Sequence, residues 1–132
     1  MHEWALAEAV IAAASDTAHK EGLKKVTEVR ITIGEMQQVE RDIFCFALEQ
    51  LRPAEFADTK FEVEEERAEL RCRACEFEWF FSGNKLDKAS TEAVHFVPEV
   101  AHAYMKCPRC GSPDFDIVKG RGVWLKTLKG VK

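Results

Sequence analysis

Apolar and polar residues recur along the first fifty positions with the periods of a helix, a strand and a second helix. Over residues 3–21 apolar side chains return every three or four positions, which predicts an amphipathic helix. Gly22 follows as a residue suited to a helix C-terminal end. The predicted buried face of this helix comprises Leu6, Ala9, Val10, Ala13, Ala14 and Ala18.

Two strands and a second helix are expected after it. Alternation predicts a strand over 26–33, and a helix over 40–52 ends before Pro53. The next strand begins at Phe61 and runs towards Leu70. Because a helix separates the strands, a parallel pair with a right-handed crossover is expected. The fold class is therefore α/β (α+β), with two helices packed on a small mixed sheet. The apolar positions are Val29, Ile31 and Ile33 in the strand, and Ile43, Phe44, Ala47, Leu48 and Leu51 in the helix.

The remaining residues form short strands around paired cysteines. Phe77, Trp79 and Phe81 alternate as in a strand, and Ser82-Gly83-Asn84 predicts a turn. Residues 115–118 and 123–128 are expected to form a hairpin connected through Gly120 and Gly122. In an alternative arrangement, the chain re-enters the N-terminal sheet after residue 118.

Charge divides the chain of 132 residues into two parts. Residues 1–69 carry 8 Lys and Arg against 16 Asp and Glu, whereas residues 70–132 carry 11 against 7. We therefore expect two small domains, 1–69 and 70–132, with a boundary near 68–71. The overall charge of −4 and the pI near 5.6 disfavour a generally cationic nucleic-acid binder.

Apolar runs and cysteine usage predict a cytoplasmic protein. No apolar run approaches the ~20 residues of a membrane span, and the first residues lack the basic region of a signal peptide. Five cysteines are an odd number, which fits reduced metal-binding thiols better than a disulfide framework.

Two Cys-x-x-Cys units carry the most specific chemistry in the sequence. Each unit presents two thiolates from one tight turn, so that Cys72, Cys75, Cys107 and Cys110 complete a tetrahedral zinc site. Four thiolates leave no open position, and the zinc is therefore structural, as in a zinc ribbon. Each Cys-x-x-Cys turn is a zinc knuckle, and the 31 residues between the two units imply a long insertion between the knuckles. A redox dithiol is the alternative, although no thioredoxin-like context surrounds either unit. Cys45, within the second helix, is interpreted as a small, partly buried apolar residue.

The first three residues, Met1-His2-Glu3, offer a second type of metal site. The α-amine, the amide nitrogen of His2 and its imidazole can form fused chelate rings on one ion. Such a nitrogen array suits Ni(II) or Cu(II) better than Zn(II). The alternative is that His2 lies in a frayed terminus without a function.

The order of the motifs resembles the HypA/HybF family of nickel-incorporation proteins for [NiFe]-hydrogenase maturation, over essentially the whole chain. The resemblance implies an N-terminal nickel-binding domain, a zinc domain and a metallochaperone role without enzymatic activity. It also implies a HypB-type GTPase partner and delivery of nickel to the hydrogenase large-subunit precursor. The motifs that carry it are Met1-His2-Glu3, Ile33-Gly34-Glu35-Met36, Phe46-Ala47-Leu48-Glu49-Gln50-Leu51 and the two cysteine units, the second as Cys-Pro-Arg-Cys-Gly-Ser.

The resemblance also implies a nickel ligand set. His2 is the principal ligand, Met1 supplies its amine, and Glu3 contributes its backbone nitrogen or contacts the partner. His95, in the insertion, is preferred over His102 as a further donor that closes the site. His19 complements the carbonyl end of the first helix.

Two other classes of function compete with this interpretation. A zinc-ribbon adaptor for nucleic acid or protein would use the basic C-terminal end, although its lysines also suit a solvated hairpin. No triad, phosphate loop or open metal site points to an enzyme. An acidic run is interpreted as a solvated edge, or a docking face for a cationic partner. It contains Glu62, Glu64, Glu65, Glu66 and Glu69. No membrane is involved, and the chain is a monomer or a homodimer.

Overall fold

The computed structural model describes residues 2–81, 88–103 and 105–132. It divides into two compact units, each built from separate stretches of chain. The first contains the chain up to Thr32, Val39–Glu64 and Val123–Lys132. The second contains Ile33–Gln38 and Glu65–Gly122. The chain therefore passes between the units several times.

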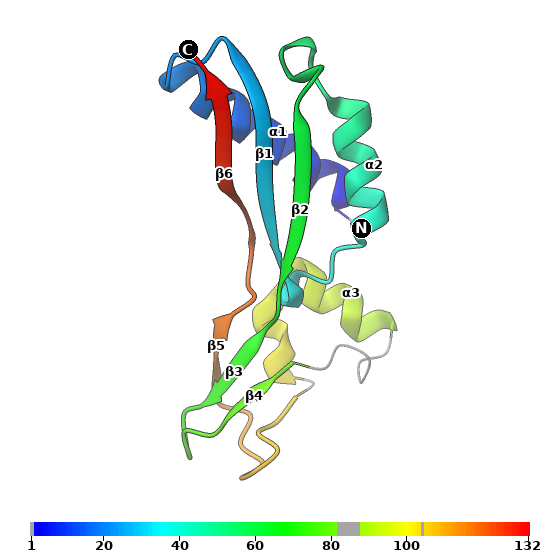
Figure 1. Ribbon diagram of the computed structural model, residues 1–132. Helices are drawn as coiled ribbons and strands as arrows, with labels where there is room; N and C mark the ends of the chain where they lie inside the picture. Colours follow the sequence, from blue (N-terminus) through cyan, green and yellow to red (C-terminus); the bar gives the residue numbers. More distant parts are fainter. Residues whose placement is uncertain (1, 82–87, 104) are drawn as a thin grey trace. The chain divides into compact units, whose positions relative to one another are not determined.

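The first unit is a mixed three-stranded sheet with helices on one face. Its sheet has the strand order β2-β1-β6, in which β1 and β2 run in the same direction and β6 runs against them (Figure 1). The parallel pair agrees with the predicted crossover through the second helix. The elements of this sheet and its helices are α1 (Glu3–Lys20), β1 (Lys25–Gly34), α2 (Arg41–Leu51), η2 (Ala54–Phe56), β2 (Lys60–Glu66) and β6 (Val123–Val131).

The core of the first unit lies between the sheet and the two helices. The strand face predicted from alternation is buried. On the predicted face of α2, Phe44, Ala47 and Leu48 are buried, whereas Ile43 and Leu51 are half-buried. The predicted face of α1 is partly wrong, because Ala9 and Ala13 are exposed whereas Ala7 and Ile11 are buried. Alanine is common on both sides of this helix, so the sequence pattern alone leaves the rotation of the helix poorly defined.

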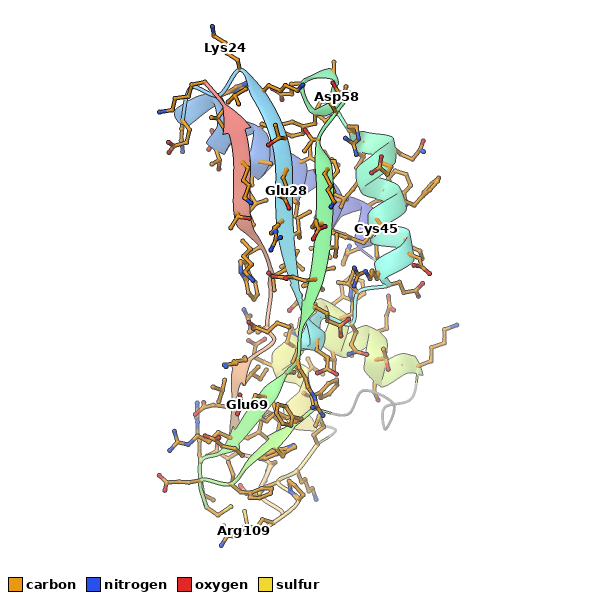
Figure 2. All side chains as sticks on the ribbon, in the orientation of Figure 1. Lys24, Glu28, Cys45, Asp58, Glu69 and Arg109 are labelled. Carbon is orange, nitrogen blue, oxygen red and sulfur yellow. The ribbon has the colours of Figure 1, made fainter. Side chains whose placement is uncertain are left out.

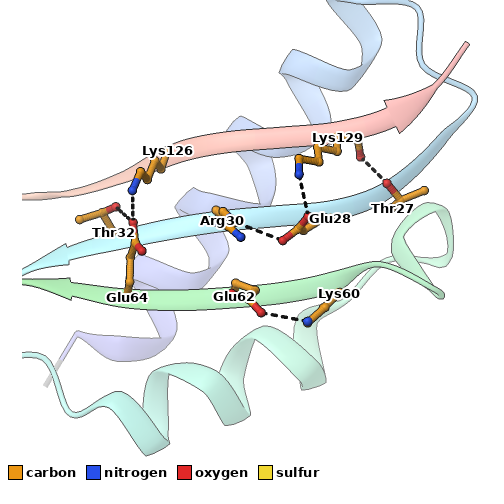
Figure 3. Close-up of polar contacts among 9 residues, drawn as sticks. All are labelled: Thr27, Glu28, Arg30, Thr32, Lys60, Glu62, Glu64, Lys126 and Lys129. Carbon is orange, nitrogen blue, oxygen red and sulfur yellow. Dashed lines mark hydrogen bonds and ion pairs between the residues drawn. The ribbon is translucent and has the colours of Figure 1, made fainter.

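The opposite face of the sheet carries ion pairs, both between strands and within one strand (Figure 3). Glu64 Oε1 lies 2.7 Å from Lys126 Nζ, and Lys60 Nζ lies 2.9 Å from Glu62 Oε1. The hydrogen bond from Lys126 lowers the pKa of the Glu64 carboxyl. β2 is an edge strand of its sheet, and the Glu62 and Glu64 side chains are 41% and 44% exposed, so the interpretation of the acidic run as a solvated edge fits these residues, whose carboxylates also form ion pairs.

The second unit is an antiparallel sheet covered by short helices. Its strands have the order β4-β3-β5, and β3 pairs antiparallel with both neighbours. The long insertion between the cysteine pairs contributes α3 and η4, which supply Val94 and Ala101 to the core around Leu70 and Phe115. The elements are η1 (Glu35–Gln37), β3 (Glu69–Cys72), β4 (Glu78–Phe80), α3 (Lys88–Phe96), η4 (Pro98–Ala103) and β5 (Phe115–Lys119).

The predicted C-terminal hairpin is wrong, although both of its strands are present. β5 pairs with β3, whereas β6 joins the other sheet beside β1. The chain leaves β5 through Gly120, which has a φ of +89° and packs so closely that an added Cβ would lie 2.4 Å from Ala68 Cα. Glu66 Oε1 also accepts the Gly120 N–H at 2.9 Å. Alternation predicted the strands but not their partners. The turn predicted at 82–84 lies outside the described residues.

Candidate metal centres

The structure brings the four paired cysteines into one cluster. Their Sγ atoms all lie within 4.8 Å of one another. Cys72 Sγ is 3.5 Å from Cys110 Sγ, and Cys75 Sγ is 3.6 Å from Cys107 Sγ. A regular tetrahedron with Zn–S bonds of about 2.3 Å has edges of about 3.8 Å. The cluster therefore has the donors and the dimensions of a zinc site.

Two matching turns hold these sulfur atoms. In the first knuckle the Glu76 N–H donates to Cys72 O at 3.0 Å, and in the second the Gly111 N–H donates to Cys107 O at 2.9 Å. Both turn residues have a left-handed backbone, with φ of 64° for Glu76 and 78° for Gly111. Glycine adopts this conformation readily, whereas the residue type of Glu76 does not favour it, so the first turn is predicted by its Cys-x-x-Cys spacing alone.

The protein around the sulfurs differentiates the thiols. Desolvation opposes ionisation of Cys107, but the backbone N–H groups of Cys110 and Arg109 outweigh it and lower its pKa to about 7. The Ser112 N–H favours the thiolate of Cys110, yet the neighbouring thiols, Cys72 first, together with partial desolvation raise its pKa to about 12. A cation at the centre would favour the thiolate form of all four.

Arg73, inside the first knuckle, ties it to the strand that follows the second. Its Nη2 and Nε lie 2.5 and 2.9 Å from Asp116 Oδ1, and its N–H donates to Asp114 O at 3.0 Å. The Arg73 hydrogen bond lowers the pKa of the Asp116 carboxyl. The second knuckle has Pro108 at the corresponding position, and its own arginine, Arg109, directly precedes Cys110 (Figure 2). No sequence pattern predicted the Arg73–Asp116 pair.

The composition of the cluster, four thiolates, favours a structural role. Cys72 and Cys107 are buried, Cys75 is intermediate and Cys110 is exposed. Four thiolates fill a tetrahedral coordination shell, so the arrangement holds an ion without an open position for water or substrate. Among the described residues, it is also the one cluster of three or more metal-ligating side chains. Cys45 lies apart from it in α2 and is half-buried.

The amino-terminal candidates lie at the start of α1, although Met1 is outside the described residues. His2 is exposed and occupies the N-cap position of the helix. Its carbonyl accepts the Leu6 N–H at 2.8 Å. The Glu3 side chain is only 3% exposed, and its Oε2 accepts the Glu40 N–H, 3.2 Å away, just before α2. The Glu3 carboxylate therefore joins the first turns of two helices.

The other histidines have contacts within their own units. His95 is buried, and its Nδ1 lies 2.5 Å from Gln37 O. His102 stacks on Phe115 with ring centroids 4.1 Å apart. His19, in the last turn of α1, has Nε2 3.4 Å from a Glu55 carboxylate oxygen.

The basic C-terminal end is not a bare cationic patch. Lys126 pairs with Glu64 at 2.7 Å, and Lys129 Nζ lies 3.4 Å from Glu28 Oε2. Arg121 likewise forms an ion pair with Glu99. Paired cations have less charge to offer a phosphate backbone, which counts against the nucleic-acid adaptor.

The fold and the cysteine cluster thus define an α+β protein with a four-thiolate metal site. A family model described as "Hydrogenase/urease nickel incorporation, metallochaperone, hypA" matches residues 1–130. The chain belongs to this HypA family of nickel metallochaperones for hydrogenase maturation, as the order of its motifs predicted.

Individual relatives agree with the family match. The chain is 46% identical to the hydrogenase maturation factor HypA of Thermococcus kodakarensis, over 98% of this chain and 95% of that protein. It is 45% identical to the protein of the same name from Pyrococcus horikoshii, with the same coverage. A solution structure of the nickel metallochaperone HypA from Helicobacter pylori has the same fold, with a TM-score of 0.65, 22% identity, and coverage of 99% of this chain and 98% of that one.

A second solution structure, of a HypA protein, gives a TM-score of 0.62 at 26% identity, over 99% of this chain and 97% of that one.

In the part of the chain that the structure describes, no helix combines the length and the apolar character needed to cross a membrane.

Proposed function

We propose that the protein binds Ni(II) at its amino terminus and helps to deliver it to the large-subunit precursor of a [NiFe]-hydrogenase. The Met1 amine, the amide nitrogen and imidazole of His2, and the backbone nitrogen of Glu3 form the chelate. The observation that carries the proposal is the exposed His2, which directly precedes an anchored helix.

The contacts of His2 and Glu3 support the proposal, because they hold these two residues to the rest of the first unit. The His2 carbonyl belongs to the hydrogen bonds of α1, through Leu6. One residue further on, the buried Glu3 carboxylate binds the Glu40 N–H. With both positions fixed, the backbone nitrogens of the first residues lose less conformational freedom when a metal binds.

Helix electrostatics favour the ligand form that nickel requires. The first N–H groups of a helix are not used by the helix's own hydrogen bonds, and the dipole there favours negative charge. A deprotonated amide nitrogen supplies such a charge. The positive end of α1 therefore stabilises the amide anion that a planar nitrogen chelate needs, and nickel affinity rises with pH as protons are released.

Two metals are then kept apart by ligand chemistry. The four thiolates hold a structural zinc, whereas the nitrogen donors select Ni(II). An ion held at an exposed terminus is open to a partner, which suits transfer. We assign a HypB-type GTPase as that partner, on the family resemblance, and the cytoplasm as the compartment, because the thiols must stay reduced.

His95 is proposed as a further nickel donor on the family resemblance alone. A His95→Ala variant that binds nickel with unchanged affinity removes this ligand from the proposal and leaves the terminal chelate intact.

The test is a calorimetric nickel titration of zinc-loaded, untagged protein. An N-terminal extension of two residues, which caps the amine, and His2→Ala should each weaken nickel binding at least tenfold. His19→Ala is the matched control, because it removes an exposed imidazole from the same helix, and it should bind like the unmodified protein. Equal affinity in all four proteins would refute the terminal site.

A further inference from the structure

Two large aromatic side chains are exposed together on the helical surface of the first unit. Trp4 on α1 is 45% exposed and Phe46 on α2 is 58% exposed. Their rings meet edge to face, with centroids 6.0 Å apart and an interplanar angle of 80°. Aromatic residues are enriched in protein interfaces, and Trp is among the residues that most often carry the binding energy.

The core does not need these two rings. The inner face of α2 is completed by Phe44, Ala47 and Leu48, which are buried. On α1, Ala7 and Ile11 face inward. The two rings instead contact each other across the helices, and this T-shaped contact holds them in place before any partner arrives.

The rim of the aromatic pair is acidic. Glu8 lies one helical turn from Trp4, and Asp42 and Glu49 lie one turn on either side of Phe46; all three are exposed. No Lys or Arg occupies the positions three or four residues from either ring on these described helices. Glu49 also pairs with Arg52 at 2.8 Å, so Glu8 and Asp42 are the carboxylates that would meet a cation most directly.

This charge pattern indicates which kind of partner would bind the aromatic pair. A second copy of the chain would bring the same carboxylates against this surface, and anionic lipid would be repelled, so both are disfavoured. A protein segment with apolar side chains and at least one Lys or Arg complements both the exposed aromatic rings and their acidic rim. Its apolar groups cover the rings, and its cation meets the carboxylates or the face of Trp4.

We propose that Trp4 and Phe46 form a docking surface for a basic, apolar segment of a partner protein, beside the amino terminus. The inference rests on the proposed function for its purpose, since Trp4 is two residues from His2. A partner docked there has its own metal ligands within reach of the nickel site. Docking and metal transfer thus use adjoining parts of one helix end.

The experiment selects ligands from a phage-displayed library of random 16-residue peptides on the immobilised, zinc-loaded full chain. A Trp4→Ala/Phe46→Ala variant serves for counter-selection, and circular dichroism verifies that it folds. Peptides that survive should be enriched in Lys or Arg together with Leu, Ile or Phe. Failure to enrich any peptide, or enrichment of acidic ones, overturns the proposal.

Calorimetry on the best synthetic peptide then tests the residues one at a time. Phe46→Ala should weaken binding at least tenfold, and Glu8→Gln/Asp42→Asn at least threefold with a smaller salt dependence. Phe80→Ala is the control, because Phe80 is 50% exposed in the second unit, and it should change affinity less than twofold. Equal effects of Phe46→Ala and Phe80→Ala overturn the proposal.

The nickel titration separates this inference from the proposed function. Phe46→Ala should bind nickel like the unmodified chain, because Phe46 supplies no ligand. If nickel binds normally but no peptide depends on Phe46, the docking surface fails and the chelate stands. If peptides bind as expected but nickel does not, the docking surface stands and the proposed function fails.

Discussion

Glu3→Ala tests whether the hydrogen bond between the Glu3 carboxylate and the Glu40 N–H stabilises the first unit. The Glu3 side chain is 3% exposed, and its Oε2 lies 3.2 Å from the Glu40 nitrogen. Removal of the acceptor leaves the Glu40 N–H without this partner, which costs about 1–3 kcal/mol. Loss of a carboxylate from the first turn of α1 costs about 0.3–1 kcal/mol more. We expect a decrease of about 2 kcal/mol in the free energy of unfolding.

Urea unfolding followed by far-ultraviolet circular dichroism, with zinc present, measures this change. Glu3→Gln keeps an oxygen acceptor and should lose under about 1 kcal/mol. Glu8→Ala removes an exposed carboxylate from the same helix and should stay within about 0.5 kcal/mol of the unmodified protein. If Glu3→Ala is no less stable than Glu8→Ala, the carboxylate does not hold the two helices and the reasoning fails.

Three further predictions concern backbone, charge and metal. Gly120→Ala should destabilise the fold by about 2–4 kcal/mol, because its Cβ would collide with Ala68, whereas Gly22→Ala, with open space, should cost about 1 kcal/mol in thermal or urea unfolding. The Lys126 hydrogen bond lowers the pKa of the Glu64 carboxyl below its ordinary 4.5. The ionised carboxylate therefore stabilises the folded protein above pH 4.5, and this contribution is lost as the pH falls through the folded-state pKa. Lys126→Met should raise the pKa of Glu64, as measured by a carboxyl NMR titration. Zinc removal by a chelator should increase amide hydrogen exchange in β3 and β5 far more than in β1. An equal increase in all three strands would contradict a zinc site that stabilises the second unit alone.

Local sequence patterns predicted most of the helices and strands, but they did not predict which distant segments pair with one another. The helices, the first strands and the cysteine knuckles each depend on spacings of a few residues, and the sequence shows such spacings directly. The pairing of β5 with β3 depends on partners far apart in the chain. Alternation is the same whichever strand lies alongside, so the predicted hairpin was an assumption about neighbours.

The candidate sites show the same division. Cys-x-x-Cys and Met1-His2-Glu3 are chemical motifs that are complete within a few residues. The contact of Glu3 with Glu40, 37 residues away, and the Arg73–Asp116 pair, 43 residues apart, involve residue types common on any surface. Only the fold shows that one carboxylate anchors a helix and that an arginine closes a knuckle.

X-ray absorption at the zinc and nickel edges of one doubly loaded, untagged sample tests the separation of the two metals most directly. The zinc edge should show four sulfur neighbours at about 2.3 Å. The nickel edge should show nitrogen or oxygen neighbours alone, and a protein with a capped amine should lose that nickel signal. Sulfur in the nickel shell, or nickel retained unchanged after capping, would contradict the account.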